Sequence, residues 1–351
     1  MKKVTIKDIA KIAGISRGTV DRVINNRGNV EKDLEQKILK IATELGYEKN
    51  LMASNLATKK TFKVAAITSD PATDLFWSFP KMGIQKALKV VKHYGVEVEY
   101  FHFPHFDSDV FSLQMENALL SKPDGILLSP LYTLESELFL DTAVTRNIPV
   151  ITINTEINHP GVLSYVGQHS YYAGYLAGRL LHLRLSTEDE VIALNLGHKV
   201  SNATHYSDKI EGLKAYFNDH NLMKNNVYWY EFDQYNDKRS LLEFFNQLKE
   251  KHPKLKALFF TNSRAYKLLD LLDYEYCKSM YIVGFDMIEP NIAHLKKGKM
   301  DFIINQNPIQ QGYQGLMTFI DHVFLKQEIK KKQYLPLDIV LKENVDFYLN
   351  Y

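Results

Sequence analysis

The sequence predicts an α/β protein in which a small N-terminal three-helix head precedes two Rossmann-like lobes. Two observations carry this prediction. Residues 5–45 hold three short amphipathic segments, separated by residues that end and begin helices. From residue 62 onward, short apolar runs alternate with longer amphipathic stretches, which is typical of parallel strands joined by helices. We expect a head over residues 1–47, a linker over 48–61 and a core over 62–351.

The head has the form of a helix-turn-helix followed by a third helix. Thr5 is placed to cap the first helix with Asp8 as its capping-box partner, and Gly14 can take the positive φ that ends this helix. Ser16 is the next N-cap, so the second helix begins at Arg17. The inward residues of the second and third helices are Val20, Val23, Ile24, Leu34, Ile38, Ile41, Ala42 and Leu45, and the third helix stops at Gly46.

Several stretches of this head carry a specific family pattern. They are Val4-Thr5-Ile6-Lys7-Asp8-Ile9-Ala10, Ala13-Gly14-Ile15-Ser16, Thr19-Val20, Arg22-Val23-Ile24-Asn25 and Leu45-Gly46-Tyr47, and the match runs through this segment without a gap. The head therefore resembles that of the lactose-repressor (LacI) family of bacterial transcription regulators. The resemblance extends over essentially the whole chain and implies a core similar to a type I periplasmic sugar-binding protein. It also implies a homodimeric repressor that is not an enzyme, with operator DNA and a small-molecule effector as its partners.

The second helix of the head is the predicted recognition helix. An arginine at the start of such a helix can bond O6 and N7 of guanine in the major groove, and Arg17 has that position. Arg22 lies on the adjoining face, while Gly18 offers no side chain to a base. For each arginine the alternative role is a phosphate contact. The predicted DNA-binding residues are Thr5, Ser16, Arg17, Gly18, Thr19, Arg22, Asn25 and Arg27 in the head and Asn50, Ala53 and Leu56 in the linker.

The linker has helical spacing at Met52, Ala53, Leu56 and Ala57 but is too short to hold a helix alone. In the resembled family this segment is the hinge helix, and paired hinges of a dimer wedge leucines into the minor groove. Leu56 has the matching place. Two residues depart from the family pattern: Lys49 replaces a usual proline, and Ser54 a frequent arginine. The departures imply weaker ordering of the hinge or a different operator centre.

The core alternates predicted strands and helices. The strands are expected at 64–67, 96–101, 125–128, 150–153, 191–196, 227–232, 255–260, 280–285, 302–304 and 339–341, and the helices at 81–94, 111–120, 134–146, 171–185, 208–220, 240–251, 265–272 and 310–325. So many strands indicate two sheets. The resemblance implies three crossings between lobes, which we place near 158–162, 286–290 and 330–334. The N-lobe would then span about 62–160 and 290–330, and the C-lobe 161–289 and 331–351.

A ligand site is expected between the lobes, where the strands end. Planar polar groups bond sugar hydroxyl pairs and aromatic faces cover sugar C–H surfaces, and residues of both kinds follow the apolar runs. The predicted ligand-binding residues are Asp74, Phe76, Trp77, Asn154, Thr155, Lys209, Asn262, Asp286 and Gln306. They also resemble the sites of the similar sugar-binding proteins. Taken singly, Phe76 or Trp77 is more often part of a hydrophobic core.

Two of these residues depart from the family pattern, because Asn154 stands for a common aspartate and Lys209 for a common arginine. A lysine cannot bond two hydroxyls bidentately, and losing one carboxylate makes the site less anionic. The default effector is therefore a sugar, and the charge balance predicts that an acidic or phosphorylated sugar binds better than its neutral parent. A nucleobase or nucleoside is the alternative within the regulator class, since Phe76 and Trp77 would suit it. Beyond that class, the alternative is a solute-binding protein without a regulatory role.

Composition limits the remaining classes. The first 60 residues hold 13 Lys and Arg against 7 Asp and Glu, which is a basic head on a slightly acidic body and favours contact with phosphate at one end. The single Cys277 and the lack of a signal peptide or a long apolar run indicate a cytoplasmic protein away from membranes. The pairs His102/His105 and His198/His205 lack supporting ligands, and no nucleotide loop or nucleophile motif occurs. We therefore expect no metal, no cofactor and no catalysis.

Overall fold

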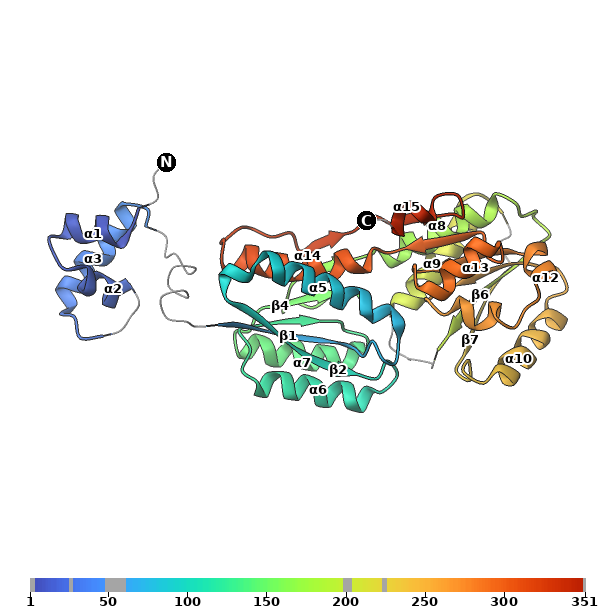
Figure 1. Cartoon of the computed structure of the whole chain (residues 1–351), viewed down its shortest axis with the longest axis horizontal. Helices are drawn as coiled ribbons and strands as arrows, with labels where there is room; N and C mark the ends of the chain where they lie inside the picture. The colour runs from blue at the N-terminus through green and yellow to red at the C-terminus, as the bar shows by residue number, and fades with distance from the viewer. Residues whose placement is uncertain (1–3, 25–27, 48–60, 198–203, 223–225, 350–351) are drawn as a thin grey trace. The chain divides into compact units, whose positions relative to one another are not determined.

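The computed structural model describes residues 4–24, 28–47, 61–197, 204–222 and 226–349 (Figure 1). The chain divides into two compact units, residues 1–60 and 61–351. The predicted DNA contacts Asn25, Arg27, Asn50, Ala53 and Leu56 lie outside the described residues. None of the described helices is long and apolar enough to cross a membrane.

The head contains three helices, α1 (Ile6–Ala13), α2 (Arg17–Ile24) and α3 (Lys32–Glu44). Asp8 accepts hydrogen bonds from the backbone N–H and the hydroxyl of Thr5, which confirms the predicted capping box. Gly14 ends α1 with φ +69°, and Ser16 Oγ accepts the N–H of Thr19 at the start of α2. The buried side chains that hold the three helices together are Ile9, Ala10, Val20, Val23, Ile38 and Ala42. The predicted helix-turn-helix is thus confirmed in its boundaries and its core.

The first lobe of the core is a six-stranded parallel sheet covered on both faces. Its strands lie in the order β11 (Lys332–Tyr334), β5 (Val162–Gly167), β4 (Val150–Ile153), β3 (Gly125–Leu128), β1 (Phe62–Ser69) and β2 (Val96–Phe103). Its helices are α5 (Ser78–Val90), α6 (Ser108–Leu120), α7 (Thr133–Thr145) and α14 (Pro308–Val323), with the 3-10 turns η1 (Leu75–Trp77) and η2 (Lys92–Tyr94). The apolar run of β1 faces both layers, since Val64 packs with α5 and α14 and Ile67 packs with α6 and α7.

The second lobe repeats this plan. Its strands lie in the order β12 (Asp338–Val340), β10 (Phe302–Asn305), β9 (Tyr281–Phe285), β8 (Leu255–Phe260), β6 (Glu190–Leu196) and β7 (Val227–Phe232), and only β12 runs antiparallel to its neighbour. Its helices are α8 (Ser170–His182), α9 (Thr204–Asp219), α10 (Lys238–Lys251), α11 (Ala265–Leu269), α12 (Tyr274–Ser279), α13 (Glu289–Lys297) and α15 (Val345–Leu349). The two lobes confirm the predicted fold class.

The chain crosses between the lobes at places that differ from our prediction. β5 pairs with β4 in the first sheet, so the first crossing lies at 168–169 and not near 158–162. β10 pairs with β9 in the second sheet, so the second crossing follows residue 305 and not residue 286. Residues 332–334 pair with β5 before the third crossing, at 335–337. The lobe boundaries predicted at 160/161, 289/290 and 330/331 were therefore wrong.

Two missed strands, β5 and β11, explain this error. β5 contains the buried polar residue Ser164 and begins with a register shift against β4, so it lacks the continuous apolar run used to find strands. β11 has only three residues, none of them buried. The segment at 158–162 is a turn into β5, where the N–H of Gly161 bonds to His159 Nδ1. A Pro-Gly turn and a crossover look alike in sequence.

Candidate functional site

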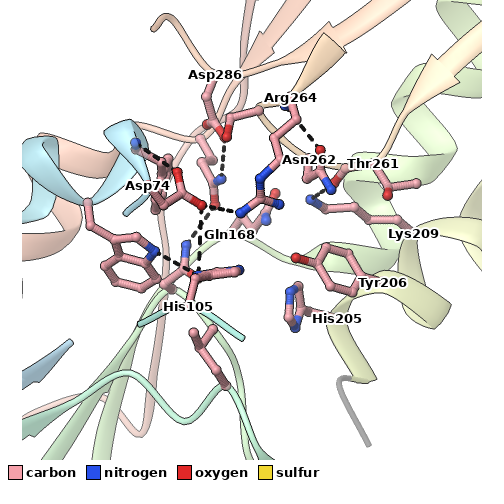
Figure 2. Close-up of a pocket in the computed structure, with 16 residues that line it drawn as sticks. Asp74, His105, Gln168, His205, Tyr206, Lys209, Thr261, Asn262, Arg264 and Asp286 are labelled. Atoms are coloured by element: carbon pink, nitrogen blue, oxygen red, sulfur yellow. Dashed lines mark hydrogen bonds and ion pairs between the residues drawn. The ribbon is translucent and has the colours of Figure 1, made fainter. Parts of the chain in front are cut away.

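A polar pocket lies between the two lobes, where their strands end (Figure 2). Asp74 and Trp77 follow β1, Asn154 follows β4, and Asp286 follows β9. Gln168 and Gln306 occupy the first and second crossings. The other lining residues are Phe76, His105, Leu131, His205, Tyr206, Lys209, Thr261, Asn262, Ser263 and Arg264. The cavity volume is about 40 Å³, which on this measure is room for roughly three water molecules.

Eight of the nine predicted ligand-binding residues line this pocket. They are Asp74, Phe76, Trp77, Asn154, Lys209, Asn262, Asp286 and Gln306. Thr155 does not line it: the side chain is 1% exposed, and its hydroxyl donates to Asn154 Oδ1 at 3.4 Å. Asn154 has φ +69° and Asp286 has φ +63°, the left-handed conformation that Asn and Asp tolerate better than other side chains. Both strands therefore turn sharply at the pocket.

A chain of amide hydrogen bonds links the two lobes behind the pocket. Asn154 Nδ2 donates to Gln306 Oε1 at 3.3 Å and to Gln311 Oε1 at 3.4 Å. Gln306 Nε2 in turn donates to Asp286 Oδ2 at 3.0 Å. Asn154 belongs to the first lobe and Asp286 to the second, so Gln306 at the crossing holds a side chain of each.

A second network of asparagines positions Arg264. Asn262 Nδ2 donates to Asn195 Oδ1 at 2.6 Å and to the carbonyl oxygen of Leu196 at 3.1 Å. Asn262 Oδ1 accepts the backbone N–H of Arg264 at 3.0 Å. This turn directs the Arg264 side chain across the pocket, where Nη2 forms an ion pair with Asp74 Oδ2.

The second cation of the pocket, Lys209, is buried and engaged. Its Nζ donates to the carbonyl oxygen of Thr261 at 2.7 Å and lies 3.8 Å from the ring centroid of Phe285. Burial lowers the pKa of Lys209 to about 8, against the effect of the Asp286 carboxylate. Burial likewise raises the pKa of Asp286 to about 7, and the Lys209 charge opposes that rise. The pocket thus holds two cations, Lys209 and Arg264, and two carboxyl groups, Asp74 and Asp286.

The two histidines of the pocket are neutral at neutral pH. Burial and the Arg264 charge lower the pKa of His105 to about 4, and burial with the Lys209 charge lowers that of His205 well below its usual value. Trp77 Nε1 donates to His105 Nδ1 at 3.2 Å, so Nδ1 is the acceptor and the ring proton is on Nε2. His105 is therefore no ionic partner for Asp74, although 3.8 Å separates Nδ1 from Oδ2.

Four buried polar atoms that line the pocket have no hydrogen-bond partner among the described residues. They are Gln168 Oε1, His205 Nδ1, Thr261 Oγ1 and Asp286 Oδ1. Leaving a buried polar atom unpaired is costly, so four of them around one cavity indicate a ligand that pairs with them. The amide and carboxylate oxygens are acceptors, and the hydroxyl can accept or donate. The pocket therefore suits a ligand whose groups can both donate and accept hydrogen bonds.

Sequence reasoning missed several lining residues. Gln168 was missed because β5 was not predicted, and Arg264 because only Asn262 was considered in the polar segment after β8. His105 and His205 had been considered only as metal ligands, and the structure brings both to the pocket. No group of three or more side chains able to hold a metal ion occurs among the described residues.

The described part of the head presents its predicted DNA contacts to solvent. Thr5, Ser16, Arg17, Gly18 and Arg22 are exposed. Thr19 is half-buried, and its hydroxyl lies 2.8 Å from that of Ser16, so these two side chains support the start of α2.

The fold and the two sites define a class of protein: a helix-turn-helix head carried by a two-lobed α/β core with a polar pocket between its lobes. Comparison with known families gives the same result. The family model described as bacterial regulatory proteins, lacI family, matches residues 5–50, and the model described as periplasmic binding protein domain matches residues 64–327. The chain therefore belongs to the periplasmic binding protein domain family over residues 64–327, and residues 5–50 form a LacI-family regulatory domain.

Individual relatives agree with this assignment. The NTD biosynthesis operon regulator NtdR of Bacillus subtilis is 25% identical over 97% of this chain and 99% of its own length. Catabolite control protein A of Staphylococcus xylosus is 30% identical, but the match spans 46% of this chain and about half, 47%, of that protein. A crystal structure from Bacteroides fragilis, assigned to the LacI transcriptional regulators, has a TM-score of 0.74 at 25% identity and covers 82% of this chain and 100% of that one.

Proposed function

We propose that this protein is a ligand-responsive transcriptional repressor that binds operator DNA through its head and an effector in the interlobe pocket. We place it in the cytoplasm, where the DNA lies. It acts there as a homodimer, because an operator read by a short recognition helix needs two half-sites for adequate affinity and specificity. The exposed arginines of α2 support the DNA contact, and the pocket supports the effector. A solute-binding protein without a regulatory role would have no use for such a head.

The effector is a neutral polyhydroxylated molecule, a sugar or a close derivative. One observation carries this step: the unpartnered pocket atoms Gln168 Oε1, His205 Nδ1, Thr261 Oγ1 and Asp286 Oδ1 need hydrogen-bond partners, and sugar hydroxyls, which both donate and accept, can pair with each of them. The charges favour a neutral ligand over an acidic one, since Arg264 is paired with Asp74 and Lys209 is bonded to Thr261. Phe76 and Trp77 belong mainly to the hydrophobic core of the first lobe, which weakens the nucleoside alternative.

A thermal-shift panel on the full chain tests this proposal. The panel holds D-ribose, D-arabinose, D-glucose, D-galactose, D-gluconate, D-glucose 6-phosphate, adenine and adenosine. Binding at 100-fold excess over the Kd adds about 2.7 kcal/mol of stability, which raises the melting temperature by roughly 5 °C or more. We expect a neutral sugar to give that shift, and Asp286→Asn to abolish it.

The matched control is Asp301→Asn, since burial also raises the pKa of this second-lobe carboxyl but it lies outside the pocket. We expect the control to respond as the wild type does. If adenosine alone raised the melting temperature, the effector would be a nucleoside. If D-gluconate or D-glucose 6-phosphate raised it and D-glucose did not, the effector would be an acidic or phosphorylated sugar. A gel-shift selection of operator DNA, repeated with the bound ligand, then shows whether the ligand releases DNA.

A further inference from the structure

The ion pair between Arg264 and Asp74 crosses the pocket from one lobe to the other (Figure 2). Arg264 follows β8 in the second lobe, and Asp74 follows β1 in the first, 190 residues away. Each side chain is only 7% exposed. Removing either partner would leave the other charge buried and unpaired, which a protein tolerates poorly.

Arg264 is anchored in its own lobe before it reaches the other. Its Nη1 donates to the carbonyl oxygen of Leu196 at 3.3 Å, and its guanidinium carbon lies 5.4 Å from the ring centroid of Tyr235 in the second lobe. The same carbon lies 4.9 Å from the ring centroid of Phe106 in the first lobe. The two rings are 6.2 Å apart, so they approach each other around the cation. The arginine therefore joins the lobes by an ion pair and by its ring contacts.

The pair also limits the space for a ligand. The cavity of about 40 Å³ has room for roughly three water molecules, whereas a monosaccharide has several times as many non-hydrogen atoms. Sites for such ligands usually measure about 300 Å³ or more. Asp74 and Arg264 both line this cavity, so their separation would widen it for such a ligand.

We infer that the Asp74–Arg264 pair is a lock between the lobes, which closes the pocket in the effector-free protein and which the effector must break in order to bind. The inference rests on the proposed function in one respect only, that the effector occupies this pocket. In a regulator held by this pair, the lobes are already together before the effector binds. The effector then replaces the ion pair as the contact that joins them.

The lock also selects among ligands. A hydroxyl group can donate to the Asp74 carboxylate and accept from the Arg264 guanidinium, so inserting one hydroxyl keeps both buried charges satisfied. An anion would satisfy Arg264 but leave Asp74 unpaired, and a cation would do the reverse. The lock therefore favours a neutral polyol.

Distance measurements on the effector-free full chain test the lock. Spin labels at Glu116→Cys on α6 and Gln247→Cys on α10 report the separation of the lobes, since both positions are exposed and the native Cys277 is buried. We expect one narrow distance distribution with the pair intact. Asp74→Asn and Arg264→Gln should each broaden it and shift it to longer distance by more than about 2 Å. The two variants remove opposite ends of the same ion pair. The test therefore needs only one variant that folds, as judged by its melting temperature.

The matched control is Arg184→Gln, which removes a guanidinium from an ion pair with Asp301 inside the second lobe and should leave the distance unchanged. A broad, long distribution in the parent, or an unchanged one in a folded lock variant, would overturn the inference. No effector is present, so that failure leaves the proposed function standing. Conversely, a panel in which no compound shifts the melting temperature counts against the proposed function and not against the lock.

Discussion

The carbonyl oxygen of Lys209 on α9 lies so close to the α-carbon of Gly174 on α8 that a Cβ there would come within 1.7 Å of it. Gly212 and Tyr171 repeat this contact one turn further along, where a Cβ on Gly212 would come within 1.8 Å of the Tyr171 carbonyl oxygen. Two glycines, one on each helix, thus allow α8 and α9 to pack backbone against backbone. The position of Lys209 in the pocket depends on that contact.

Gly174→Ala should therefore destabilise the core by about 1–3 kcal/mol, because the added methyl group has only backbone to displace. It should also weaken effector binding, since α9 must shift and carries Lys209 with it. Thermal melting measures the first effect and calorimetry with the identified sugar the second. A variant that melts and binds as the wild type does would show that the helices separate without cost.

The buried carboxyl group of Asp286 should make stability depend on pH. Its pKa is about 7 in the folded protein, above the ordinary 3.8. Between these values the folded state keeps a proton that the unfolded state has lost, so this group contributes stability below pH 4 that is lost as the pH rises through 7. We expect Asp286→Asn to remove this part of the pH dependence. The measurement compares melting temperatures of the two proteins from pH 4.5 to pH 7.5.

The comparison reports on Asp286 together with its partner Lys209, because the other titrating groups remain in both proteins. The melting-temperature difference, variant minus wild type, should grow with pH over this range. Lys209 interacts with Asp286, so the two titrate as a pair, but the lysine pKa of about 8 places its own transition above the range. A difference that stays constant from pH 4.5 to pH 7.5 would mean that Asp286 is already ionised throughout.

Binding of the effector should change by less than about twofold between 50 and 500 mM salt, since a neutral ligand exchanges no net charge with the solvent. Lys209→Gln should weaken binding only moderately, because its Nζ already donates to Thr261. Calorimetry at the two salt concentrations measures the Kd of the effector for the wild type and for Lys209→Gln. A fall of tenfold or more, abolished in Lys209→Gln, would restore the acidic or phosphorylated sugar that the charge balance of the sequence predicted.

The sequence predicted the site better than it predicted the lobes, and the reason is physical. Asp74, Asn154 and Asp286 each follow a continuous apolar strand, so the end of the run marks the residue that meets the pocket. β5 and β11 lack that signal, because β5 carries the polar residue Ser164 within a short run and the edge strand β11 has three residues, none of them buried. The boundaries between the lobes depend on exactly those strands.

The sequence also could not predict which distant residues pair with each other in the folded protein. Arg264 and Asp74 are 190 residues apart, and nothing local to either indicates the other. Lys209 appeared to be a free cation for an anionic ligand, and only the folded chain shows the Thr261 carbonyl that its ammonium group meets. Charge counted along a sequence therefore overestimates the charge that a pocket has left for its ligand.

Arg17 should determine base preference, because it is exposed at the first position of α2, where a recognition helix meets base edges. After selection of an operator from random DNA, Arg17→Ala should lose roughly 1–3 kcal/mol of discrimination at one base pair of each half-site. Its affinity for random DNA should change much less. Lys40→Ala is the control, since Lys40 is an exposed lysine on α3 away from the recognition helix. Titrations against single-base operator variants measure both. If Arg17→Ala weakened binding equally to the operator and to random DNA, with every base preference retained, Arg17 would contact phosphate alone, and Arg22 would be left to read the sequence.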